Sequence, residues 1–410
     1  MAVLQTLFGG LTSLTFLAFL VSLGIATYIG TRRNRNAERR MAAKLAEKEA
    51  FASPAGPRAL PIETNDPDLA ERAAVARYIA DLMLADEWTE IGDQIAHWES
   101  QLASTPSGLR YHDIATDVAL SGLQSLIDNA PRQSLADLRE AEIELGHFID
   151  TYQRATESHV LALLAARAHL AIGAACRADL WPEPQRRQAW RTMARHFVDA
   201  GEILGNYDPL AHMSPLLAEA RYLQALGSPA GSHRLPRLFE KWVDLDPANP
   251  AIYERHADHL ADPDIFSDEA ILAEADAALE RTDDTLGFGG YALFFLPLLE
   301  RRDGARHLLD ADLFASAMLD LASLEASQAE VNQAANALAA EVRADHNQNL
   351  ALSDTLYMVI QDYLEVIYPR LWTLPQDDVQ ALVQEAADVI PVPVGDTAVN
   401  ENHTRMSEAA

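Results

Sequence analysis

The chain has 410 residues, of which 49% are hydrophobic and 23% are charged, as is ordinary for a folded protein. Its net charge of −29 is far from neutral. An acidic surface repels nucleic-acid phosphates at long range, so we expect no nucleic-acid partner. The single cysteine excludes an intramolecular disulfide and any metal site built from several cysteines.

The N-terminal segment, residues 1–30, has no charged side chain. Within this segment, the stretch from Leu7 to Ile29 is 23 uncharged residues long. At about 1.5 Å per residue, this stretch is long enough to cross a hydrocarbon core of roughly 30 Å. A cleaved signal peptide would need a basic region before a shorter apolar run, and Met1 to Thr6 contain no Lys or Arg. The sequence therefore predicts a single transmembrane anchor over residues 1–30.

A basic cluster directly after this segment predicts its orientation. Residues 1–50 hold seven Lys or Arg and three Asp or Glu, a net of +4, so the rest of the chain carries −33. Basic residues beside a span stay on the cytoplasmic side of the membrane. We therefore expect a short N-terminus outside and a cytoplasmic body, with the topology signal in Arg32, Arg33, Arg35, Arg39 and Arg40.

Small residues recur at every fourth position of the expected span, at Ala18, Ser22, Ala26 and Gly30. Small side chains on one helical face let a second transmembrane helix approach closely. The pattern thus predicts a packing face toward another membrane helix. Chance remains the alternative, because small residues are common in such helices.

The remainder divides by composition into a basic helical stalk over 31–51, a Pro-rich linker over 52–66, a helical domain over 67–390 and a tail over 391–410 that we expect to be disordered. No alternating strand pattern occurs, and the fold class predicted is all-α. The helices expected from apolar spacing and breakers are 67–86, 88–104, 110–128, 133–153, 157–179, 183–205, 214–226, 233–245, 250–261, 268–282, 289–301, 310–323, 326–344, 350–368 and 376–389.

The stretch WVDLDPANPAIYERHADHLADPDIFSDEAILAEADAALERT, residues 242–282, resembles a tetratricopeptide repeat. In that family a helix ends in Asp-Pro and the next helix pair carries spaced small and aromatic residues. The matching positions are Asp246 and Pro247 in the turn, Tyr253, Ala257 and Leu260 in the first helix, and Ala270 and Ala277 in the second. A partial second match lies at Trp88, Ile91, Gly92 and Ile95.

The resemblance implies an α-solenoid of helical hairpins, a fold in which such repeats usually bind other proteins. With the anchor, this predicts a single-pass scaffold or adaptor on the cytoplasmic face of a bacterial inner membrane. Its expected partners are the lipid bilayer, through the N-terminal helix, and other proteins, such as a membrane complex or another transmembrane helix. A periplasm-facing adaptor with the same anchor and an enzyme with an unrecognised site remain the alternatives.

Residues with metal-binding or catalytic chemistry are present but lack the required partners. Glu144 and His147 would need a second Glu-x-x-His pair to form a di-iron site. His256 and His259 would need a defined third ligand. The sequence therefore predicts no catalytic residue, no metal and no cofactor, and we expect a protein that is not an enzyme.

A local basic cluster, RADLWPEPQRRQAWRTMARHF at 177–197, stands out in the acidic body. Arg187, Arg191 and Arg195 share one helical face, with Trp190 nearby. Arg and Trp are common hot-spot residues in interfaces. These four residues are the predicted partner-binding site, and neutralisation of the arginines by neighbouring acidic helices is the alternative.

Overall fold

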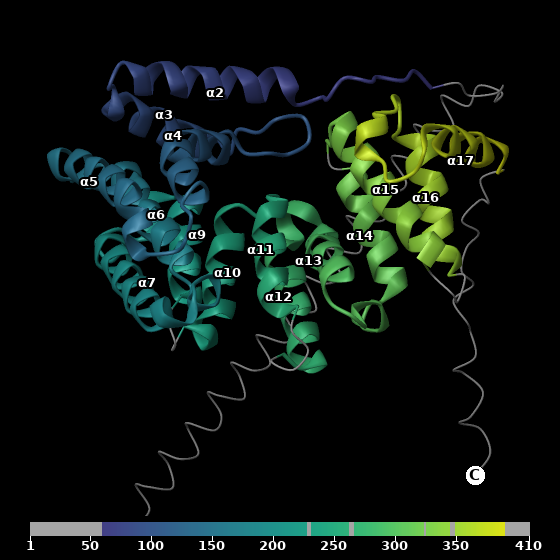
Figure 1. Cartoon of the computed structure of the whole chain (residues 1–410). Helices are drawn as coiled ribbons and strands as arrows, with labels where there is room; N and C mark the ends of the chain where they lie inside the picture. Colours follow the sequence, from purple (N-terminus) through teal and green to yellow (C-terminus); the bar gives the residue numbers. More distant parts are fainter. Residues whose placement is uncertain (1–59, 228–230, 262–265, 324, 345–348, 390–410) are drawn as a thin grey trace, which may run out of the picture. The chain divides into compact units, whose positions relative to one another are not determined.

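The computed structural model describes residues 60–227, 231–261, 266–323, 325–344 and 349–389. Within these ranges every regular element is a helix, and β pairing is limited to two isolated bridges (Figure 1). The all-α fold class is confirmed. The described helices include none that has both the length and the apolar character to cross a membrane. The expected anchor, stalk and tail lie outside the described residues.

The α-helices are α2 (Leu69–Leu84), α3 (Trp88–Gln101), α4 (Tyr111–Asp128), α5 (Arg139–Arg154), α6 (His159–Ala175), α7 (Glu183–Leu204), α8 (Pro209–His212), α9 (Pro215–Leu226), α10 (Leu235–Leu245), α11 (Pro250–Leu260), α12 (Asp268–Leu286), α13 (Gly289–Arg301), α14 (Ala311–Ser323), α15 (Gln328–Ala344), α16 (Leu350–Asp362) and α17 (Gln376–Asp388). Short 3-10 helices lie at Leu135–Leu138, Ala178–Leu180, Ser232–Arg234, Ala305–His307 and Pro369–Leu371.

Most expected helices begin and end within a few residues of the observed ones, because their caps are local. Ser158 caps α6 by accepting a hydrogen bond from the backbone N–H of Leu161 at 3.3 Å. Asn249 caps α11 in the same way, through the N–H of Ala251 at 3.1 Å. The one-turn helix α8 was not expected.

The helix expected over 350–368 is too long, since α16 ends at Asp362. Side-chain amides of α15 replace the helical hydrogen bonds beyond that point. Gln328 Nε2 donates to the carbonyl of Tyr363 at 2.9 Å, and Gln328 Oε1 accepts from the N–H of Glu365 at 2.8 Å. Asn332 bonds the backbone of residues 366 and 368. The connection is therefore fixed by a neighbouring helix.

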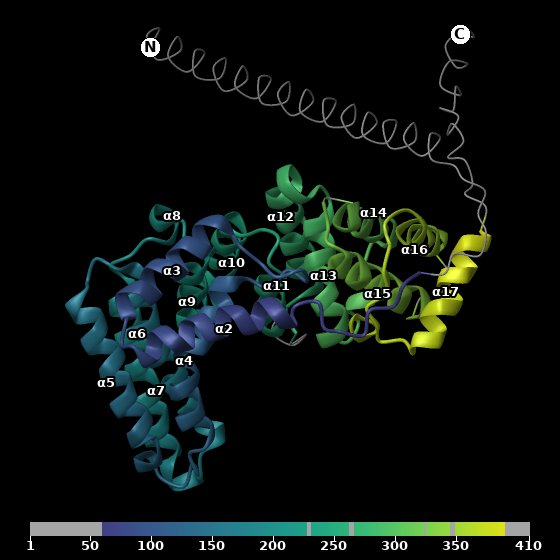
Figure 2. The same ribbon diagram turned by 90° about the horizontal axis from the view of Figure 1, so that it is seen from above.

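Most successive helices pack on one another and often on the next but one, as α11 and α12 both do on α13. This is the arrangement of packed helical hairpins, compatible with a helical-repeat fold. Buried apolar side chains form two clusters, one over α2–α9 and one over α9–α17. Figure 2 shows the same succession from above, with α9 and α10 between the two groups of helices.

A buried ion pair links the two groups. Arg110, at the start of α4, donates from Nε to Asp246 Oδ2 at 2.8 Å and from Nη2 to Asp246 Oδ1 at 2.5 Å. Its Nη1 donates to the carbonyl of Leu102 at 2.8 Å. Asp246 belongs to the Asp-Pro turn that the sequence marks as a repeat boundary. This turn therefore anchors an arginine 136 positions earlier in the chain.

The described chain starts beside its C-terminal helices. Ile62 forms a parallel bridge with Ile367, in which Glu63 donates its N–H to the carbonyl of Ile367 at 2.9 Å. The chain then runs as an extended segment to α2 (Figure 1). The last residues of the expected linker, 60–66, thus hold specific contacts. A fragment meant to fold should therefore keep them.

The tetratricopeptide positions are reproduced in part. Tyr253, Ala257 and Leu260 are buried in α11, as the resemblance implies. In α12 the buried residues are Ile271, Ala275, Ala278 and Thr282, whereas Ala270 and Ala277 are partly exposed. In α3, Ile91, Gly92 and Ile95 are buried, and a Cβ added at Gly92 would lie 3.2 Å from Ser158 Oγ. Small residues therefore mark close helix contacts, but the register of the second helix differs from the family pattern.

Candidate functional site

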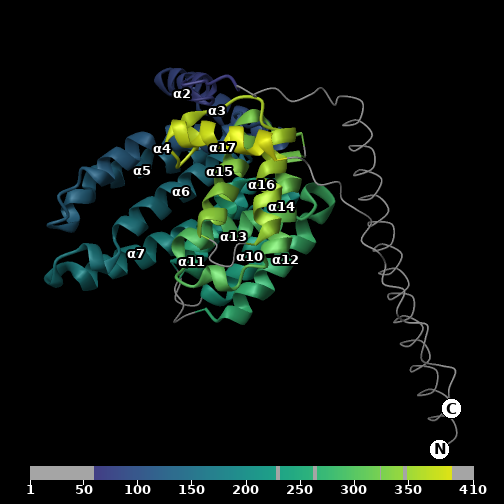
Figure 3. The same cartoon turned by 90° about the vertical axis from the view of Figure 1, so that its right-hand side faces the viewer.

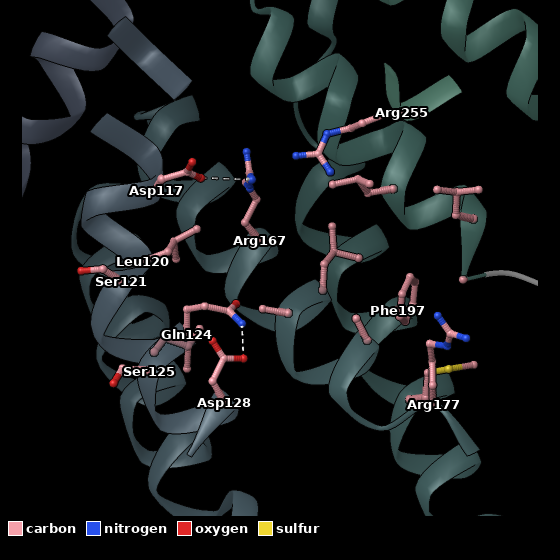
Figure 4. Close-up of a pocket in the computed structure, with 18 of the residues that line it drawn as sticks. Asp117, Leu120, Ser121, Gln124, Ser125, Asp128, Arg167, Arg177, Phe197 and Arg255 are labelled. Atoms are coloured by element: carbon pink, nitrogen blue, oxygen red, sulfur yellow. Dashed lines mark hydrogen bonds and ion pairs between the residues drawn. The ribbon is translucent and has the colours of Figure 1, made fainter. Parts of the chain in front are cut away.

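A groove of about 1330 Å³ lies between α4, α6, α7 and α9 (Figure 4). Its floor is apolar. The side chains that form the floor are Leu120, Leu123, Leu170, Ala171, Ala174, Met193, Phe197, Leu223 and Leu226. These residues face inward because each helix presents its i, i+3, i+4 stripe to its neighbours.

One rim of the groove is polar and comes from a single helix. Asp117, Ser121, Gln124, Ser125 and Asp128 follow one another along α4 at helical spacing (Figure 4). Gln124 Nε2 donates to Asp128 at 2.8 Å. The Asp117 side chain is 76% exposed, so this rim offers a carboxylate to solvent.

A charged network closes one end of the groove. The Glu219 carboxylate receives Arg167 Nη1 at 2.7 Å on one oxygen and Arg255 Nε at 2.8 Å on the other. Arg167 Nη2 also lies 3.9 Å from Asp117 Oδ1. Arg167 and Glu219 are almost fully desolvated, whereas Arg255 and Asp117 face solvent. The network therefore has a fixed inner pair and two outer groups that remain accessible.

Burial shifts the pKa of ionisable side chains at this end of the groove. Desolvation raises the pKa of Asp113, next to the network, to about 6, while His112 opposes the rise. Burial works to lower the pKa of Arg167, but the carboxylates around it, Glu219 first, outweigh burial and raise it.

The floor side chain Phe197 is held between two glycines. A Cβ added at Gly173 would come within 2.8 Å of the Phe197 ring, and one added at Gly227 within 1.9 Å. Neither distance is possible without movement of the ring. These two glycines thus leave the space that the Phe197 ring occupies.

The four predicted partner-binding residues lie on α7. Arg187, Trp190 and Arg191 are exposed, and neither arginine forms an ion pair with any described residue. Arg195 differs, because its Nη2 lies 3.1 Å from Glu142 Oε1 on α5. The structure thus separates the stripe into an accessible part and one intramolecularly paired arginine. That these four residues bind a partner protein stays a prediction.

The other predicted functional residues, Ala18 to Gly30 and the arginines of 32–40, fall outside the described residues. The groove itself was not anticipated. Its only sequence signal is Arg167, a charge inside the largely apolar helix α6. The partners of Arg167, Asp117 and Glu219, lie 50 and 52 residues away. Such a charge indicates a buried partner without identifying it.

No protein-family model, no curated protein and no solved structure matches this chain. The resemblance to tetratricopeptide repeats therefore depends on the motif residues and on the packed helical hairpins.

Proposed function

We propose that this protein is a membrane-anchored scaffold or adaptor, with a tetratricopeptide-like domain that binds a segment of a partner protein in the groove between α4 and α7. The observation that carries the proposal is the groove, with its apolar floor and charged rims. Its volume of about 1330 Å³ exceeds the range of about 300–1,000 Å³ typical of small-ligand sites. A polypeptide segment suits it better than a small molecule.

The occupant that fits is an amphipathic helix with basic residues on one flank. Its apolar i, i+3, i+4, i+7 positions would pack on Leu170, Phe197 and their neighbours, as in other helix-in-groove complexes. Its basic flank would face Asp117 and Asp128 on α4. The net charge of −29 for the whole chain favours the approach of such a basic segment.

The location rests on the uncharged run of residues 7–29 and the arginines that follow it. A phosphatase that is active only outside the cytoplasm, fused after Ala410, is expected to be inactive. A fluorescent protein that folds in the cytoplasm is expected to fluoresce at the same position. Strong phosphatase activity would instead support the periplasm-facing alternative.

Photocrosslinking in cells of the native host tests the groove. A benzophenone amino acid replaces Ala174 on the floor, Trp190 on the outer face of α7, or Ala74, an exposed residue of α2. We expect a discrete crosslinked product from position 174 whose mapped peptide is an amphipathic helix with a basic flank. Ala171→Trp, which fills the groove, should abolish this product, and Ala74→Trp should not.

Three results would overturn the groove assignment. The product from position 174 could persist in the Ala171→Trp variant, or it could map to a segment without helical apolar spacing. Alternatively, the product could arise from position 190 alone, which would transfer the binding site to the exposed Arg187, Trp190 and Arg191 face of α7.

A further inference from the structure

A histidine pair lies buried where α5, α6 and α7 pack together, with α6 between the other two (Figure 3). His169 belongs to α6 and is 6% exposed, and His196 belongs to α7 and is 1% exposed. Their Nδ1 atoms are 3.0 Å apart. The carboxylate of Asp199, one turn after His196, brings its Oδ2 to 3.9 Å from Nδ1 of His169. One ligand atom from each of the three residues lies within 4.8 Å of the others.

The geometry is close to that of a metal site. Zn–N bonds of about 2.0–2.1 Å in a tetrahedral site place two ligand nitrogens about 3.3 Å apart. The two Nδ1 atoms are thus only a few tenths of an ångström closer than a metal would hold them. Asp199 is 39% exposed and can rotate inward without disturbing the core.

Glu142 on α5 provides the outer contact that such a site needs. Its Oε1 lies 3.2 Å from Nε2 of His196 and 3.1 Å from Nη2 of Arg195. A metal-binding histidine usually donates its second N–H to a carboxylate, which fixes the tautomer. Nε2 of His196 also lies 3.1 Å from Nη2 of Arg195, and the tautomer that carries Nε2–H donates to Glu142. In that tautomer the Nδ1 lone pair of His196 points toward His169.

The electrostatics also favour a cation. Both imidazole rings are buried, which disfavours the charged form and favours the neutral form that binds a metal. The carboxylates of Asp199 and Glu142 and the guanidinium of Arg195 together carry one net negative charge. Two imidazoles and one carboxylate suit zinc and similar transition metals, whereas calcium and magnesium prefer oxygen ligands alone.

We propose that His169, His196 and Asp199 bind one divalent transition-metal ion of the zinc class, with Glu142 as the positioning residue for His196. Three protein ligands leave one coordination position for water. In the ion-free protein one Nδ1 carries the proton that bridges the two rings. Binding moves that proton to Nε2 of the same ring, so no net proton is released.

The ion would join α6 to α7, and the same helices line the floor of the groove through Ala171, Ala174, Met193 and Phe197, although none of the three ligands lines it. It would thereby stabilise the packing of these two helices. This role does not depend on the proposed partner, because it can be measured on the purified chain alone.

The test is titration of the detergent-purified, chelator-treated full chain with Zn²⁺, and with Co²⁺ as a spectroscopic probe. We expect one ion per chain, a tetrahedral Co²⁺ absorption spectrum and a higher melting temperature with Zn²⁺. Asp199→Asn should weaken binding at least tenfold, and Glu142→Ala about 10- to 100-fold. Both side chains are partly exposed, so these variants should keep the parent circular dichroism spectrum.

Matched controls separate this site from surface binding. His147→Gln removes an exposed histidine of α5, Glu202→Gln removes an exposed carboxylate of α7, and neither should change the affinity. Arg195→Ala removes a nearby positive charge and should leave the affinity equal or higher. The proposal is wrong if no stoichiometric binding occurs, or if folded Asp199→Asn binds as the parent does. Equal loss in Arg195→Ala and Glu142→Ala would remove the role assigned to Glu142.

Discussion

The pair of Arg110 and Asp246 should be among the most sensitive points of the fold. Both side chains are buried, at 9% and 0% exposure, and they join the two groups of helices. Arg110→Ala removes three charge-assisted hydrogen bonds and leaves the Asp246 carboxylate buried without its counter-charge. Breaking a buried pair from one side costs about 3–5 kcal/mol. We expect a loss of this size in the free energy of unfolding.

Equilibrium urea unfolding of the purified chain, followed by circular dichroism, measures this loss. Because the pair bridges the two core clusters, the variant should also unfold less cooperatively, as coupled units do when their interface weakens. Arg343→Ala is the control, since Arg343 lies 3.9 Å from Asp378 with both side chains more than half exposed. Removal of an exposed partner of this kind should cost less than about 1 kcal/mol.

The double variant Arg110→Ala with Asp246→Ala separates the pair from its surroundings. Its loss in free energy of unfolding should be smaller than the sum of the losses of the two single variants, by a coupling energy of about 2 kcal/mol or more. Two results would refute the reasoning that this ion pair is desolvated and connects the two groups. The losses in free energy of unfolding of the two single variants could be additive, or the loss in Arg110→Ala could be no larger than that in Arg343→Ala.

Three further predictions follow from local contacts. Asn332→Ala leaves partly buried backbone groups of residues 366 and 368 without this partner and should lower the free energy of unfolding by about 2–4 kcal/mol in the same urea assay. The raised pKa of Asp113, about 6 against an ordinary 3.8, means that the folded state binds a proton more tightly than the unfolded state. The free energy of unfolding of the parent, measured relative to that of Asp113→Asn, should therefore rise by about 1 kcal/mol as the pH falls from 7.5 to 5, after allowance for the partial exposure of Asp113. A difference between the two proteins that does not change with pH would contradict this prediction. Gly122→Ala, with open space around its Cβ, should raise the free energy of unfolding by about 0.5–1 kcal/mol. Gly227→Ala must displace the Phe197 ring and should lower the free energy of unfolding. A Gly227→Ala variant more stable than Gly122→Ala would show that the ring is not confined.

The helical elements follow from local patterns in the sequence. Apolar side chains at helical spacing, with caps such as Ser158 and Asn249, specify where a helix begins through contacts a few residues apart. The Asp-Pro turn at Asp246 and the buried Tyr253, Ala257 and Leu260 were visible for the same reason. These signals are local, so a single sequence contains them.

Which side chains those helices bring together depends on how the helices pack. Residues 363–368 look helical, yet Gln328 and Asn332 of another helix bind their backbone and end α16 at Asp362. Similarly, the groove and the cluster of His169, His196 and Glu142 depend on contacts across 27 to 54 positions. Helical periodicity indicates that a face is buried but not which face it meets. Apolar burial is non-directional, and only the packed arrangement fixes which polar groups become neighbours.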